Sequence, residues 1–230
     1  MVLKLGGSVL YDKSLNLNIN LLQKLKNWYH DEKNNFQKLV IVVGGGTFSR
    51  DVQKRVANSI GGDEYLHNIG MAVTQTNAAI VQGYLEDPDI YIPRKIGDAY
   101  EYIINNEKVV MVSGGLKVGW STDMDAAVFA DILDCDRVFK ISDIEYLFNK
   151  DPKEHIDASP IKDITWGEYF DLFKIDKDSM HHANHSIPID VGCALFCQSK
   201  NISFIISGGK KLQEEQSIGN ILSEGSFIHN

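Results

Sequence analysis

The sequence is poor in cysteine and proline, and it lacks any apolar run long enough to cross a membrane. Its 230 residues include 3 cysteines and 5 prolines. Cys135, Cys193 and Cys197 are odd in number and contain no Cys-x-x-Cys pair, which argues against a disulfide framework or a zinc knuckle and favours a reducing compartment. The first residues also lack the pattern of a signal peptide. We therefore expect a cytoplasmic protein with no membrane partner.

Positive charge is scarce as well. The chain has 23 Lys and Arg against 31 Asp and Glu, and its formal net charge is −8. A nucleic acid polymer needs a basic surface, so the composition argues against such a partner. The net charge is compatible with a small anionic substrate, because a few hydrogen-bond donors gathered at one site outweigh it locally. The length suits one α/β domain, residues 1–230.

Short apolar runs alternate with stretches of helical spacing. The runs predict strands at residues 2–5, 38–43, 109–112, 137–142 and 202–207. Helices are expected at residues 18–29, 50–59, 65–84, 123–133, 165–173 and 190–199. This alternation predicts an α/β fold, a three-layer αβα sandwich with a mostly parallel central sheet. The polar segments 150–162 and 173–188 are expected to be an exposed loop and a mobile segment.

Three expected strands end in glycine-rich turns, which are Gly6-Gly7-Ser8, Gly44-Gly45-Gly46-Thr47 and Gly114-Gly115. The carboxyl ends of parallel strands share one edge of a sheet, where ligands bind. Without a Cβ, glycine N–H groups can converge on phosphate oxygens at a helix start. A tight turn explains any single pair, but three on one edge favour phosphate binding. The spacing of these glycines fits neither a Walker A loop nor a Rossmann turn, so it does not identify the ligand.

Two basic residues accompany these turns. Lys4 lies within the first apolar strand, two residues before Gly6. Burying an unpaired ammonium is costly, so we expect Lys4 to reach a transferring phosphoryl group rather than only extend to solvent. Arg50 follows the second glycine turn by four residues and can clamp a phosphate in bidentate fashion.

Together these residues resemble the amino-acid-kinase superfamily, and within it the UMP kinases, over nearly the whole chain. The matching segments are Lys4-Leu5-Gly6-Gly7-Ser8, the run from Gly44 to Arg50, residues 69–78, Ser121-Thr122-Asp123 with Ala126-Ala127, Lys140 with residues 142–152, and Ile189-Asp190. Their order and spacing carry the resemblance. It implies a carbamate-kinase-like fold with an acceptor-binding part at about 1–115 and an ATP-binding part at about 116–230.

The resemblance also implies roles for individual residues. The catalytic group would be Lys4, Arg50, Asp123 and Asp190, with Asp190 orienting Lys4 or Mg²⁺. The acceptor would contact Gly45, Gly46, Arg50, His67, Gly70, Thr74, Ser121 and Thr122. ATP would contact Lys4, Gly6, Gly7, Ser8, Lys140, Ser142, Phe148 and Asp151. No metal site is expected from protein ligands alone.

The implied activity is transfer of a phosphoryl group from ATP, with Mg²⁺, to a phosphorylated acceptor. UMP is the leading candidate, which would place the enzyme in pyrimidine nucleotide biosynthesis. Phosphoryl transfer needs in-line positioning and positive charge more than covalent chemistry. The small-molecule partners are therefore ATP and a monophosphate, and the family analogy implies a homo-oligomer, a hexamer in this group.

Three positions depart from the UMP kinase pattern. His67 stands where these enzymes carry a ribose-binding aspartate, Tyr146 replaces a glycine of the adenosine loop, and Trp120 is atypical and is expected to narrow the pocket. Two alternatives stay open. One is a sister kinase acting on another monophosphate, such as isopentenyl phosphate or a furan phosphate. The other is an ATP-binding sensor or storage protein without turnover.

Histidines 181, 182 and 185 form the remaining cluster of chemically active side chains. Their segment is polar, shows no helical apolar stripe and has no cysteine or carboxylate at a zinc-like spacing. We interpret it as a solvated loop. Cys193 and Cys197 lie four apart in an apolar stretch, which predicts small buried residues on one helix face.

Overall fold

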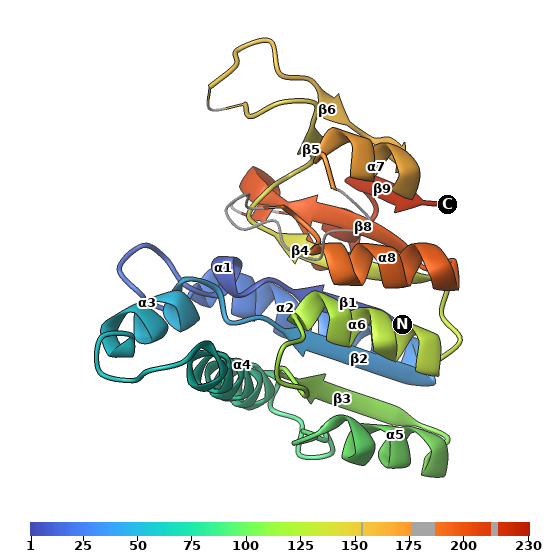
Figure 1. Ribbon diagram of the computed structural model, residues 1–230. Helices are drawn as coiled ribbons and strands as arrows, with labels where there is room; N and C mark the ends of the chain where they lie inside the picture. Colours follow the sequence, from blue (N-terminus) through green and yellow to red (C-terminus); the bar gives the residue numbers. More distant parts are fainter. Residues whose placement is uncertain (153, 176–186, 213–215) are drawn as a thin grey trace.

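A computed structural model describes residues 1–152, 154–175, 187–212 and 216–230. The histidines at 181, 182 and 185, and most of the segment 173–188, lie outside the described residues. Figure 1 shows a central twisted sheet with helices on both faces, which confirms the predicted αβα architecture. Within the described part of the chain, no helix combines the length and apolar character needed to cross a membrane.

Seven strands form the central sheet in the order β3-β2-β1-β4-β8-β9-β7. Their bounds are β1 Val2–Leu5, β2 Lys38–Val43, β3 Val109–Ser113, β4 Arg137–Ser142, β7 Asp163–Thr165, β8 Ser203–Gly208 and β9 Ser226–His229. The five strands from β3 to β8 are parallel. β9 pairs antiparallel with β8, and β7 pairs parallel with β9. The sheet is thus mostly parallel, as predicted.

Side chains alternate between the two faces along each strand, as period-2 geometry requires. On β1, Val2 belongs to one buried cluster and Leu3 and Leu5 to the other. The first cluster packs against α5 Ile96–Asn105, α6 Thr122–Ile132, α7 Trp166–Leu172 and α8 Val191–Lys200. The second packs against α1 Gly7–Leu10, α2 Ile19–Glu32, α4 Asp63–Leu85 and α9 Ile218–Leu222. α3 Gly46–Val56 follows β2.

Helix starts follow the sequence signals closely. Asn18 caps α2, and Thr165 caps α7 in a capping box with Glu168. The helix expected at 50–59 instead begins at Gly46, because the chain turns directly out of β2. The helix expected at 190–199 begins at Val191, since Asp190 is its N-cap.

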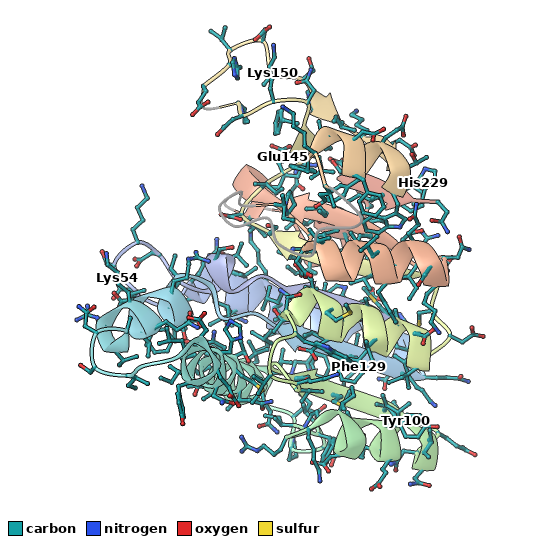
Figure 2. The ribbon with its side chains drawn as sticks, viewed as in Figure 1. Lys54, Tyr100, Phe129, Glu145, Lys150 and His229 are labelled. Atoms are coloured by element: carbon teal, nitrogen blue, oxygen red, sulfur yellow. The ribbon has the colours of Figure 1, made fainter. Side chains whose placement is uncertain are left out.

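A small second sheet extends from the main one. β5 Leu147–Phe148 pairs antiparallel with β6 Pro160–Ile161, so the end of the segment expected to be a loop is paired strand. Figure 2 shows Lys150 on the loop that projects from this hairpin, far from α3 and α4. No local pattern in the sequence predicted α5, α9, β7 or β9.

The strand order defines where a ligand fits. From β1 the chain moves to β2 and β3 on one side, and then returns to β4 on the other side of β1. In such sheets the crevice at this reversal, beyond the carboxyl ends of the strands, is the binding position. The loops after β1 and β4 therefore face the position where a site is expected.

Candidate active site

Two lysines face each other across this reversal point. Lys4 on β1 is the register partner of Lys140 on β4, so both side chains lie on the sheet face covered by α6. Asp123 in the first turn of α6 lies between them, 3.5 Å from Lys4 Nζ and 2.6 Å from Lys140 Nζ. Lys140 also donates to the Pro188 carbonyl at 2.5 Å. The result is a buried cluster of two ammonium groups and one carboxylate.

Burial sets the electrostatics of this cluster. It lowers the pKa of Lys4, an effect that Asp123 opposes and neighbouring Lys140 reinforces. Burial alone would raise the pKa of Asp123, but Lys140 and Lys4 outweigh it and the pKa is lowered. Asp123 therefore stays ionised, and when both lysines are protonated the cluster carries one excess positive charge near the end of β1.

A second acidic residue of α6, Asp125, is fully buried, and no basic side chain among the described residues forms an ion pair with it. Burial raises its pKa to about 7, although the Leu116 backbone amide and Lys4 offset part of the rise. Neither carboxyl oxygen makes a hydrogen bond of good geometry to a described residue. Its Oδ2 lies close to Gly115, at 3.7 Å from where a Cβ on that glycine would stand. Asp125 is thus an acid held in its neutral form up to about neutral pH.

We expect Asp125→Asn to stabilise the protein at pH 8 but not at pH 4. The unfolded chain releases this proton near pH 3.8 and the folded chain near pH 7. The wild-type free energy of unfolding therefore falls across this window by up to about 4 kcal/mol, a loss that Asn avoids. Denaturant unfolding of both proteins at the two pH values measures it. An equal difference at both values would show that Asp125 does not titrate there.

The first two glycine turns are packed against each other. A Cβ on Gly7 would lie 2.2 Å from the Gly46 amide nitrogen, and one on Gly46, whose φ is +59°, would lie 2.0 Å from the Gly7 carbonyl carbon. A Cβ on Gly44 would lie 3.1 Å from Lys4 Nζ and 3.4 Å from Thr122 Oγ1. Any side chain here would separate the turns, so glycine is needed to bring both backbones to Lys4.

The helices that follow these turns start without a side-chain cap. α1 after Gly6 and α3 after Gly45 have no capping hydrogen bond from a described side chain. Their first amide groups therefore keep free donors directed at the same edge. The start of α3 in particular offers N–H groups and a partial positive charge to an anion.

Asp190, which was expected to orient Lys4 or Mg²⁺, lies where α6 and α8 begin. Ser121 caps α6 by accepting from the Met124 amide at 3.0 Å and donates its hydroxyl to Asp190 Oδ2. Asp190 in turn caps α8 by accepting from the Cys193 amide at 3.0 Å. Asp190 therefore joins the starts of α6 and α8, and the carboxylate paired with Lys4 is Asp123. Lys4 and Asp190 still lie at the same end of the sheet, bridged by residues 121–123.

A cavity of about 410 Å³ opens beside this cluster. One wall comes from the starts of α3 and α4 and the other from the segment between β3 and α6. Its lining includes all eight residues predicted to contact the acceptor: Gly45, Gly46, Arg50, His67, Gly70, Thr74, Ser121 and Thr122. Arg50 is exposed, and no described carboxylate pairs with it. A free guanidinium over uncapped amides provides the donors that a phosphate requires.

The residues predicted to contact ATP lie on the other side of β1, but only some are brought together. The Gly6 amide donates to the Ile141 carbonyl at 2.8 Å, which joins the β1 turn to the end of β4 beside Ser142. Lys4, Gly7, Ser8 and Lys140 adjoin this junction. Phe148 ends β5, and Asp151 lies in the loop between β5 and β6.

Tyr146 adopts a conformation open to any residue. It is absent from the residues with positive φ, so the loop has a different path from one that needs glycine. Its hydroxyl accepts from Lys211 Nζ at 3.2 Å, and that ammonium also pairs with Glu224 at 2.5 Å. Tyr146 therefore fits this position without backbone strain.

Several cavity residues were not predicted from the sequence. They are Ser49, Gln53, Met71, Lys117, Val118 and Gly119, together with Trp120, which was expected only to narrow the pocket; Gly115 belongs to the third glycine turn expected at this edge. Helical spacing was a usable signal for Ser49 and Gln53, which share a face of α3 with Gly46 and Arg50. The loop residues had no such signal, because their position depends on where α6 begins.

The sequence profile of the Amino acid kinase family matches residues 1–207, which is most of the chain. The chain belongs to this family. Membership agrees with the strand order and with the lysine and glycine turns at the end of β1.

Uridylate kinases are among the similar proteins of known name. The enzyme of Methanococcus aeolicus is 28% identical over 231 residues, covering 100% of this chain and 99% of that relative. The one from Methanobrevibacter smithii is 28% identical over 177 residues, covering 75% of this chain and 74% of that relative.

Solved structures support the fold of this family member. Uridylate kinase from Archaeoglobus fulgidus superposes with a TM-score of 0.73 at 21% identity, covering 99% of this chain and 100% of that one. UMP kinase from Bacillus anthracis gives a TM-score of 0.75 at 17% identity, covering 99% and 94%. At this level of identity the likeness concerns the fold alone.

Proposed function

We propose that this chain is a UMP kinase, which transfers the γ-phosphoryl group of ATP to UMP and forms ADP and UDP. The observation that carries the proposal is the cavity in which Arg50, the start of α3 and Thr122 surround a space next to Lys4. Its relatives named uridylate kinase, one of them alignable over the whole chain, support the choice of acceptor.

The chemistry follows from the placement of charge. A phosphate oxygen of UMP attacks the γ-phosphorus, a new P–O bond forms, and the bond to the β-phosphate oxygen breaks as ADP leaves. The attacking oxygen is already ionised at neutral pH, so no general base is needed. The excess positive charge of the Lys4 cluster and the amides after β1 and β2 offset the negative charge on the transferring group. Arg50 holds the acceptor phosphate in line.

Mg²⁺ fits this proposal as an ion that ATP carries. Among the described residues no group of three or more His, Cys, Asp or Glu side chains could hold a metal. Mg²⁺ in kinases takes most of its ligands from phosphate oxygens and water, with one or two carboxylates. Asp190, half-buried at the start of α8, would supply such a carboxylate. The ion would neutralise charge on the phosphates.

We further propose that residues 1–115 mainly bind the acceptor and that 116–230 mainly bind ATP. Residues 117–122 line the acceptor cavity from the second part, so the two sites meet at the start of α6. A cytoplasmic location and a homo-oligomer also belong to this proposal, by analogy with the family.

The test is a coupled ADP-release assay with saturating ATP and Mg²⁺ and a panel of acceptors. We expect turnover with UMP to exceed that with isopentenyl phosphate, ribose 5-phosphate or inorganic phosphate by at least about 100-fold, because only a nucleotide uses both walls of the cavity. A Lys4→Met enzyme is the blank for contaminating kinases. No ADP formation with UMP, while another acceptor reacts, would overturn the choice of UMP.

A sister kinase acting on another monophosphate is the second candidate. His67 lines the cavity where the resemblance expects a ribose-binding aspartate. The same panel separates the two, since a non-nucleotide acceptor would then give the highest kcat/KM. ATP binding without ADP formation from any acceptor would instead indicate a non-catalytic binding protein.

A further inference from the structure

Trp120 lies in a tight turn that leads into the active site. The turn spans residues 117–120, with the Trp120 amide donating to the Lys117 carbonyl at 3.1 Å and Gly119 at a φ of +84°. Ser121 and Thr122 follow directly and start α6. The indole is therefore anchored next to the residues that adjoin the transferring phosphoryl group, on the wall of the cavity opposite Arg50.

The contacts of the Trp120 indole are typical of a ligand-binding side chain rather than of a side chain in the core. Lys117 Nζ lies 4.3 Å from the centre of the Trp120 ring, so one face is covered by a cation. No described residue accepts a hydrogen bond from the Trp120 N–H or pairs its charge with Lys117. The other two tryptophans are 7% and 0% exposed, and Trp166 donates to the Ile202 carbonyl. Of the three, Trp120 is the one that lines this cavity.

We propose that Trp120 stacks on the planar base of the acceptor and thereby selects a nucleoside monophosphate over phosphates that lack a base. This inference rests on the proposed kinase function and assigns the residue that recognises the base. Lys117 holds one face of the ring, which leaves the other face for the base. The free indole N–H can donate to a base carbonyl, whereas an aliphatic or sugar phosphate gains neither contact.

Ribose 5-phosphate is the matched ligand for the test, because it keeps the phosphate and sugar of UMP and lacks the base. We expect saturating UMP to quench tryptophan emission of the wild-type protein, and ribose 5-phosphate to leave it unchanged. In Trp120→Phe the quenching should disappear while Trp28 and Trp166 still emit. Quenching that persists in Trp120→Phe would place the base elsewhere.

Calorimetry and kinetics of Trp120→Leu complete the test. Leu keeps apolar bulk but cannot stack, so the Kd and KM for UMP should rise about 5- to 150-fold, with kcat changed less than about 3-fold. The Kd for ribose 5-phosphate should stay within about 2-fold, and Trp120→Phe should recover most of the UMP affinity. Equal weakening of both ligands, or unchanged UMP binding, would overturn the stacking role.

The two proposals fail in different ways. If UMP is phosphorylated with an unchanged KM in Trp120→Leu, the kinase function stands and the stacking role is wrong. If UMP, CMP, AMP and GMP neither bind nor react, the proposed function fails, and the base-recognition role fails with it.

Discussion

Replacing Lys4 by Met is expected to lower kcat by about 1,000-fold or more while the protein stays folded. Lys4 Nζ stands beside Gly44 and Thr122, between the cavity and the glycine turn after β1. It is the buried cation best placed to stabilise the transferring phosphoryl group, and electrostatic stabilisation of this kind contributes several kcal/mol to a transition state. Steady-state kinetics with ATP and UMP measure the change.

The free energy of unfolding of Lys4→Met distinguishes a catalytic role of Lys4 from a role in folding. Asp123 keeps Lys140 as its partner at 2.6 Å, and the excess buried charge disappears. The free energy of unfolding should therefore stay the same or increase. Lys38→Met is the matched control, because Lys38 lies at the amino end of the neighbouring strand, where its Nζ binds the Ile103 carbonyl. A wild-type rate in Lys4→Met would refute the catalytic assignment.

Replacing Asp123 by Asn is expected to destabilise the protein by about 3–5 kcal/mol and to reduce turnover as well. Asn leaves Lys4 and Lys140, register partners on adjacent strands, as buried ammonium groups without a carboxylate. Removing one partner of a buried ion pair costs this much because the remaining charges stay unsolvated. Denaturant unfolding at pH 7 measures it.

Two further variants make the interpretation specific. Asp131→Asn removes a carboxylate from the same helix, but its pair with Lys200 is exposed, so its effect should stay below about 1 kcal/mol. Adding Lys4→Met to Asp123→Asn removes one unpaired ammonium and should recover part of the lost stability. If the change in unfolding free energy of the double variant equals the sum of the changes in the two single variants, repulsion between the lysines is not the cause.

Local sequence signals located much of this fold, because they reflect backbone chemistry within a few residues. The apolar run 137–142 coincides with β4, and Thr165 begins α7 through a capping box with Glu168. The glycine turns indicated the edge of the sheet where a ligand is expected, since the carboxyl ends of parallel strands meet there. The eight residues predicted to contact the acceptor followed from the resemblance, and all of them line one cavity.

Local sequence signals could not predict which distant segments of the chain pair with each other. β9 and β7 are short. The place of β9 beside β8, and of β7 beside β9, depends on segments that come from distant positions in the chain. Asp190 was expected to orient Lys4 or Mg²⁺, but no local signal placed Asp123 between the two lysines. The packing of α6 brings Asp123 there, and Asp190 binds Ser121. The burial of Asp125 depends on the same packing of α6 on the sheet.

By itself, then, the sequence determined the kind of chemistry, because Lys4, Arg50 and the glycine turns have their hydrogen-bond donors whatever the fold. The tertiary structure alone decided which groups lie next to those donors. The packing of α6 across β1 and β4 sets two ammonium groups against one carboxylate, and the turn before α6 holds Trp120 beside the cavity. Electrostatic energies and ring stacking depend on distances of a few ångströms between segments far apart in the chain, and only the folded backbone sets those distances.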